Sequence, residues 1–99
     1  MGAIVDRAPD GFGSDPERYR YDVLFLKEPL TARAAIRLVP TRDGVDRAYA
    51  GSGVLYYSRL ISQASQSRLS RVVSMPIYGN MTIRNWNTTR SLLRLLEAG

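Results

Sequence analysis

The 99-residue sequence contains no cysteine and no histidine. The first absence excludes disulfides, thiolate zinc sites and cysteine nucleophiles, and the second excludes every triad or general-base scheme that needs an imidazole. No other catalytic constellation is recognisable, so we expect no catalytic residues, no metal site and no cofactor. The sequence therefore favours a binding protein over an enzyme.

Long hydrophobic runs are also missing, since the longest clean one is the strand-sized Val23–Leu26. The N-terminal residues Met1–Asp6 have neither a basic region nor a long apolar core, so they do not resemble a signal peptide. We expect a soluble, cytoplasmic protein with no membrane contact. The hydrophobic fraction of 44% is typical of a globular chain, and its length suits a single α+β domain over residues 1–99.

Lysine is scarce, because thirteen of the fourteen basic residues are arginine. Arginine favours bidentate and stacked contacts with phosphate or carboxylate groups. Residues 1–57 carry eight basic and eight acidic side chains, whereas residues 58–99 carry six arginines against Glu97 alone, which places the whole net charge of +5 in the C-terminal part. We therefore expect an anionic partner that contacts a basic C-terminal surface.

The pattern of apolar residues and turn formers predicts the order of the secondary structure. Residues 1–20 are expected to be partly loop, after the end of a helix in Met1–Arg7. The strands are predicted over residues 22–27, 45–50, 54–60 and 81–85, and the helices over residues 32–39 and 61–74, with a last helix capped by Asn87 or Thr88. This order predicts an α+β fold of the ferredoxin-like, split β-α-β-β-α-β type, with an appended C-terminal helix and with the helices on one face of an antiparallel-dominated sheet.

Individual side chains carry further expectations. Thr31 is predicted to cap the helix over residues 32–39, and Tyr57 to lie on the wetter face of its strand. Trp86 is expected to be structural and to pack onto the sheet or a neighbouring helix. Inward-facing helix positions are predicted at Ile61, Leu69, Val72, Leu92, Leu93 and Leu96.

Four stretches of the chain resemble a known family. They are Tyr21–Lys27, Gly53–Arg59, Ser65–Leu69 and, above all, Thr82–Thr88 with its Arg-Asn-Trp-Asn-Thr run. Over residues 4–97 the chain is similar to the C-terminal half of the family called domain of unknown function 1697 (DUF1697). The resemblance implies a bacterial α+β protein, and it implies no established activity.

The resemblance also implies a partner for this chain. The N-terminal half of the family carries a glycine-rich motif of the type Gly-Ile-Asn-Val-Gly-Gly, and nothing in this chain matches that motif. We therefore expect the chain to lack its N-terminal half. An apolar patch would then be covered by that half or by self-association.

The first candidate site is the run that follows the last predicted strand. Hydrogen-bond donors at a helix N-terminus favour phosphate, and they would come here from Arg84, Asn85, Asn87, Thr88 and Arg90. The structural alternative is that Asn87 caps the helix and Trp86 fills the core. The second candidate is an anion-binding helix face with Arg68 and Arg71, and its alternative is a solvated helix face.

Three functions remain open from the sequence. The first is a non-catalytic binding or interaction module with a basic C-terminal surface. The second is half of an enzyme or of a binding pocket for a phosphorylated or nucleotide-like ligand, in which Arg84, Asn87 and Arg68 share a concave site. The third is nucleic-acid binding, which the arginines and nearby tyrosines favour although no aromatic RNA-binding motif is present.

Overall fold

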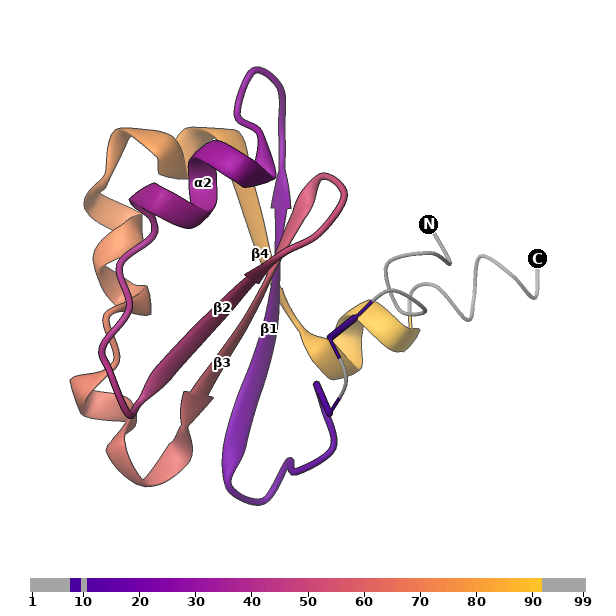
Figure 1. Cartoon of the computed structure of the whole chain (residues 1–99), viewed down its shortest axis with the longest axis vertical. Helices are drawn as coiled ribbons and strands as arrows, with labels where there is room; N and C mark the ends of the chain where they lie inside the picture. The colour runs from indigo at the N-terminus through magenta and orange to yellow at the C-terminus, as the bar shows by residue number, and fades with distance from the viewer. Residues whose placement is uncertain (1–7, 10, 92–99) are drawn as a thin grey trace.

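The computed structural model describes residues 8, 9 and 11–91 of the chain. They form an α+β fold built on a four-stranded antiparallel sheet in the order β2-β3-β1-β4 (Figure 1). The strands are β1 (Tyr19–Leu26), β2 (Asp46–Ala50), β3 (Val54–Leu60) and β4 (Met81–Asn85). All four predicted strands are confirmed; β4 has the predicted bounds, and β1 starts earlier than predicted.

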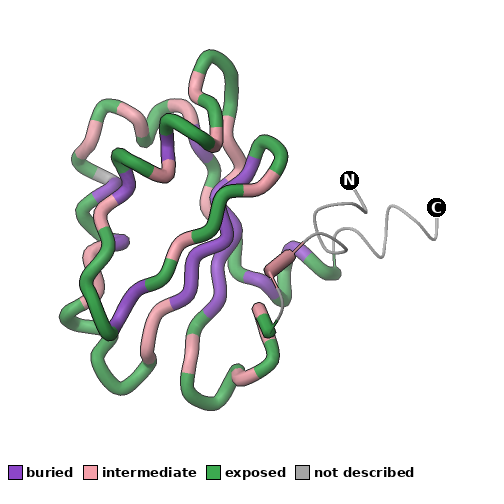
Figure 2. The backbone as a smooth tube through the Cα atoms, in the orientation of Figure 1, coloured by how far each residue is buried: buried purple, intermediate pink, exposed green. Residues whose placement is uncertain are grey.

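Strand β1 lies in the centre of the sheet because its apolar run is buried on both faces. Val23 and Leu24 are fully buried, although their side chains point to opposite faces of the sheet. Figure 2 shows the buried residues concentrated along β1 and β3. Strand β1 ends at Leu26, shortly before Pro29, whose missing N–H cannot take part in a sheet ladder.

The predicted helix after β1 is confirmed as α2 (Ala32–Leu38). Its N-cap is Thr31, as expected, because the Thr31 Oγ1 accepts a hydrogen bond of 3.2 Å from the backbone N–H of Ala34. Ala35 is buried against the sheet. The β2–β3 hairpin follows, and Gly53 in its turn has a φ of +72°, a conformation that favours glycine.

Both faces of the sheet are covered, which corrects the prediction that helices cover only one. On one face, α2 and the segment 69–81 pack on the first core cluster, which comprises Leu24, Ala35, Val39, Leu55, Tyr57, Leu69, Val72 and Met81. On the other face lies the aromatic core, which comprises Tyr21, Val23, Val54, Tyr56 and Trp86, with Phe12 packed against it. Figure 1 shows α2 and the C-terminal helix on opposite sides of the sheet.

The segment predicted as one α-helix over residues 61–74 is instead a series of short 3₁₀ helices. These are η1 (Ile61–Gln66), η2 (Leu69–Ser74) and η3 (Pro76–Asn80). Serines in this segment compete with a regular helix by bonding elsewhere: the Ser67 hydroxyl, at the break between η1 and η2, donates to the Asp46 carboxylate. Leu69 and Val72, three residues apart, are buried as predicted, whereas Ile61 is exposed.

Tyr57 is fully buried, so the prediction that it faces water is wrong. Since both faces of β3 are covered, neither Tyr56 nor Tyr57 lies on a wet face. The Tyr57 hydroxyl donates a hydrogen bond of 2.7 Å to the backbone carbonyl of Pro40. Burial, and then the nearby Asp46 carboxylate, raises the pKa of this hydroxyl.

The last helix begins at residue 86, earlier than predicted, and the structure describes it over residues 86–91. Asn85 is its cap in place of Asn87 or Thr88, because the Asn85 Oδ1 accepts a hydrogen bond of 2.6 Å from the Thr88 N–H. The expectations for Leu92, Leu93, Leu96 and the helix in Met1–Arg7 lie outside the described residues. Within the described residues, no helix has the length and hydrophobicity needed to span a membrane.

Candidate functional site

The candidate site arises because β1 is longer than its neighbour β4. Strand β1 pairs with β3 from Tyr19 onward, whereas its pairing with β4 ends at Asp22 opposite Asn85. At Asn85 the chain leaves the sheet and enters the helix over residues 86–91. The segment Tyr19–Tyr21 of β1 therefore has an edge with no partner strand.

A cavity of about 320 Å³ lies at this open edge. Tyr19, Arg20 and Tyr21 all line it, although successive side chains of a strand point to opposite faces. The cavity therefore lies around the strand edge, where the segment Tyr19–Tyr21 has no partner strand. Its volume lies at the lower end of the range, about 300–1,000 Å³, that is usual for small-molecule sites.

The other walls come from three segments that lie far apart in the sequence. The loop before β1 contributes Gly13 and Pro16, and η1 contributes Ile61 and Ala64. The end of β4 and the helix that follows it complete the lining with Asn85, Trp86, Asn87 and Arg90. The site thus combines apolar surface, aromatic rings, two side-chain amides and two guanidinium groups.

The charges around the cavity are all positive. Arg20 and Arg90 line it, and no aspartate or glutamate does. Both arginines are exposed, and within the described part of the chain the one ion pair joins Arg18 to Asp15, at 3.8 Å. Neither cavity arginine is therefore neutralised by an ion pair to a described residue, and the cavity is suited to an anion.

One carboxyl group follows Tyr21 in the sequence but does not line the cavity. Asp22 is only 6% exposed, and its Oδ2 has no hydrogen-bond partner among the described residues. Burial raises the pKa of this carboxyl above its usual range, and the nearby charges of Arg59 and Arg20 oppose that shift. Asp22 therefore lies within the electrostatic influence of Arg20 but does not neutralise the cavity by direct pairing.

The aromatic wall packs edge-to-face against Phe12. The Phe12 ring lies 5.0 Å from the Trp86 ring and 4.9 Å from the Tyr21 ring, measured between centroids. The loop is tied to β1 as well, because the Asp15 N–H donates to the Tyr21 hydroxyl at 3.1 Å. The cavity wall is thus built from packed side chains instead of free loop residues.

The structure brings together only part of the first predicted site. Asn85, Asn87 and Arg90 line the same cavity, with Trp86 between them in the sequence and buried in the aromatic core. Arg84 does not line it; its guanidinium donates a hydrogen bond of 2.9 Å to the neighbouring carbonyl of Ile83. Thr88 is exposed outside the cavity lining, with its N–H bonded to Asn85.

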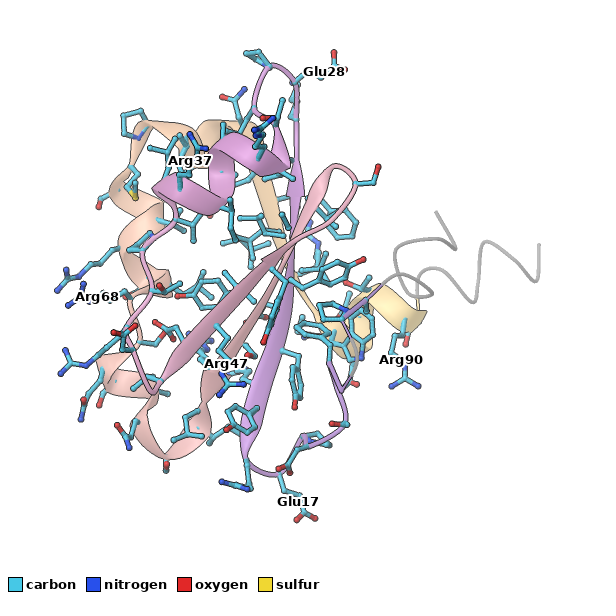
Figure 3. All side chains as sticks on the ribbon, in the orientation of Figure 1. Glu17, Glu28, Arg37, Arg47, Arg68 and Arg90 are labelled. Atoms are coloured by element: carbon cyan, nitrogen blue, oxygen red, sulfur yellow. The ribbon has the colours of Figure 1, made fainter. Side chains whose placement is uncertain are left out.

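The second predicted site lies elsewhere, so the predicted concave site shared by Arg84, Asn87 and Arg68 is wrong. Figure 3 shows Arg68 and Arg90 on opposite sides of the sheet. Arg68 is held there because its backbone N–H donates a hydrogen bond of 2.8 Å to the Asp46 carboxylate. It lines a separate, open hollow together with Thr41, Arg42 and Asp43. Arg71 is exposed on η2 and lines neither hollow.

Sequence reasoning missed the contribution of β1 to the site. Tyr19, Arg20, Tyr21 and Gly13 line the cavity, but none of them is among the predicted site residues. The alternation Tyr-Arg-Tyr is a two-residue pattern that predicts strand, and it was the available signal. Nothing in the sequence gives the difference in length between β1 and β4 that exposes the edge.

Comparisons with known proteins do not identify the chain. No family model, no curated protein and no solved structure matches it. Within the described residues, no group of three or more aspartate, glutamate, histidine or cysteine side chains could hold a metal ion.

Proposed function

We propose that this chain is a non-catalytic binding module whose cavity at the open edge of β1 holds a small phosphorylated, nucleotide-like ligand. The observation that supports the proposal most directly is the lining of the cavity: two arginines, no carboxylate and three aromatic residues. Arg20 and Arg90 would bind the phosphate, since guanidinium groups bind phosphate oxygens bidentately.

The remaining lining residues suit the rest of such a ligand. Trp86, Tyr19 and Tyr21 offer aromatic surface for a planar ring. The Asn87 amide has both donors and an acceptor for ribose or phosphate oxygens. The cavity thus has one charged part and one aromatic part, as a nucleotide does.

The finer classification of the fold is also a proposal. The strand order β2-β3-β1-β4 with antiparallel neighbours, and the connection of β1 to β2 through α2, support a ferredoxin-like topology. Short 3₁₀ helices would then replace its second helix. The Arg-Asn-Trp-Asn-Thr run likewise supports membership of the DUF1697 family as a proposal.

The proposal is tested by titrating the chain with AMP and following Trp86, its single tryptophan, by fluorescence and NMR. We expect saturable binding that weakens at least about tenfold in Arg90→Ala and in Arg20→Ala, because each loses a charge-assisted contact. Arg84→Ala and Arg71→Ala are matched controls, since both residues are exposed arginines outside the cavity.

Two results would contradict this function. One is the absence of any saturable binding of AMP at millimolar concentration. The other is a loss of binding that is equal in the cavity variants and the control variants, which would indicate a diffuse charge effect.

Nucleic-acid binding is the second candidate, and one observation favours it. Tyr19 and Tyr21 also line a neighbouring hollow, which includes the exposed Arg47 and Tyr49 on the edge strand β2. A surface that continues from one hollow to the next would suit successive stacked bases. This candidate predicts binding of short single-stranded oligonucleotides that falls steeply with salt and decreases in Arg47→Ala. Binding of AMP with little response to Arg47→Ala would exclude it.

A further inference from the structure

The edge of β1 that borders the cavity is a strip of strand backbone with a defined direction. Along β1, the Leu26 N–H donates to the Gly53 carbonyl on the β3 side, and the Lys27 N–H donates to the Asn80 carbonyl on the β4 side. Successive residues of a strand direct their polar groups to opposite neighbours. The odd-numbered residues of β1 therefore face the β4 side, and at Tyr19 and Tyr21 no β4 residue stands opposite.

Two backbone groups remain at this open edge. The Tyr19 N–H is already used, because it donates a hydrogen bond of 3.0 Å to the Asp15 carbonyl. The Tyr19 carbonyl and the Tyr21 N–H have no backbone partner in the part of the chain that the structure describes. The strand edge at the cavity thus presents, in order, an acceptor and a donor.

We propose that this strip reads the Watson–Crick edge of a 6-aminopurine. The exocyclic amine would donate to the Tyr19 carbonyl, and the ring nitrogen N1 would accept from the Tyr21 N–H. This inference rests on the proposed function and names the base of its nucleotide-like ligand.

The walls are placed to hold a planar ring against the strip. Figure 1 shows η1 and the helix after β4 on opposite sides of β1. From η1 come the apolar side chains of Ile61 and Ala64, and from the helix comes Trp86. A ring that lies in line with the strand edge would have apolar or aromatic surface on both of its faces. Arg20 and Arg90 remain for the phosphate.

The order of donors and acceptors predicts discrimination between purines. Hypoxanthine and guanine carry a carbonyl at position 6 and an N–H at position 1, which is the reverse of adenine. In the adenine pose, their carbonyl would face the Tyr19 carbonyl, and their N–H would face the Tyr21 N–H. A buried acceptor that faces an acceptor, or a buried donor that faces a donor, remains without a hydrogen bond. Such unpaired groups are the reason why hydrogen-bonding sites discriminate strongly between ligands.

The experiment compares four probes on the ¹⁵N-labelled full chain: AMP, IMP, purine riboside 5′-monophosphate and inorganic phosphate. We expect AMP to bind at least about tenfold more tightly than each of the other three. We also expect AMP, but not phosphate, to shift the Tyr21 amide resonance strongly, since that N–H would gain a hydrogen bond. The Arg71→Ala variant should reproduce the wild-type ranking.

The failures of the two proposals can be told apart. Equal affinities for AMP and IMP, together with weaker binding in Arg90→Ala, would overturn base reading and leave the anion-binding function standing. A Tyr21 amide that does not move while AMP binds would also overturn base reading. If none of the four probes binds, the proposed function and this inference both fail.

Discussion

Gly13 lies against the edge of the Trp86 indole so closely that no side chain fits between them. A Cβ atom added to Gly13 would meet the indole Cδ1 at 2.8 Å and would approach the Nε1 even more closely. Gly13 also has a φ of +84°, in the left-handed region that favours glycine. This contact joins the loop before β1 to the helix after β4, and both residues line the candidate cavity.

Gly13→Ala is therefore expected to destabilise the fold and to disturb the cavity together. The substitution adds backbone strain of about 1 kcal/mol and forces the buried indole to move, so we expect a total loss of about 2–4 kcal/mol in the free energy of unfolding. Gly11→Ala is the matched control, because Gly11 has a similar φ of +81° but its nearest neighbour would be the Ser14 Oγ at 3.8 Å. Urea unfolding, followed by Trp86 fluorescence, measures the free energy of unfolding of both variants. Equal losses in the two variants would show that the indole contact carries no energy.

The sequence was sufficient for the strands because their signals are local. The apolar run in β1 acts within a few residues, and the strand predicted there was confirmed. The prediction of one α-helix over residues 61–74 failed because the conformation of this segment depends on a contact with a residue far away in the sequence. Ser67 and Arg68 are held by Asp46, 21 and 22 residues earlier, and that contact interrupts the predicted helix.

The candidate site was predictable only in part for a similar reason. Asn85, Asn87 and Arg90 share a local pattern, and they do line one cavity. Arg20 joins them because β1 pairs with β4 as far as Asp22 opposite Asn85, and the sequence does not encode that pairing locally. The prediction that Arg68 shares this site is wrong, because Arg68 and Arg90 lie on opposite sides of the sheet (Figure 3).

The buried carboxylate of Asp46 fastens two irregular segments to β2. Its two oxygens accept hydrogen bonds from the Arg42 N–H at 3.0 Å, the Ser67 hydroxyl at 2.6 Å and the Arg68 N–H at 2.8 Å. Asp46 is only 5% exposed, so these donors have little access to water as a substitute. Hydrogen bonds to charged groups are worth about 1.5–3 kcal/mol each, and orphaned buried donors cost about as much.

Asp46→Ala is accordingly expected to lower the free energy of unfolding by about 3–5 kcal/mol. Asp46→Asn keeps the shape and one acceptor oxygen, so its loss should be smaller. The control is Asp43→Ala, since Asp43 is exposed in the neighbouring turn. Chemical denaturation gives the energies, and amide exchange at Arg68 should accelerate in Asp46→Ala. An Asp46→Ala variant as stable as Asp43→Ala would mean that solvent replaces all three bonds.

The prediction for Asp22 has the opposite sign, because the charged form of this carboxyl destabilises the folded state. Burial raises the pKa of this carboxyl, and Arg59 and Arg20, the charged groups that influence it, offset only part of the rise. Its facing neighbours across the sheet are Tyr57 on β3 and Asn85 on β4. Between the unfolded value, about 3.9, and the raised value, the folded state binds more protons than the unfolded state. The contribution of Asp22 to stability therefore falls as the pH rises through that window, and the loss persists above it.

Asp22→Asn removes this titration while it keeps the shape of the side chain. We expect the variant to gain stability relative to the wild type as the pH rises from about 3.5 to 7, with little difference at the acid end. Urea unfolding across that range, with the exposed Asp43→Asn as control, measures the difference in the free energy of unfolding. The difference between the Asp22→Asn and Asp43→Asn values at each pH excludes the titration of the exposed carboxylates that both variants retain. A wild type that becomes more stable than Asp22→Asn with rising pH would show that Arg59 and Arg20 outweigh burial, and Asp22 would then be a stabilising anion.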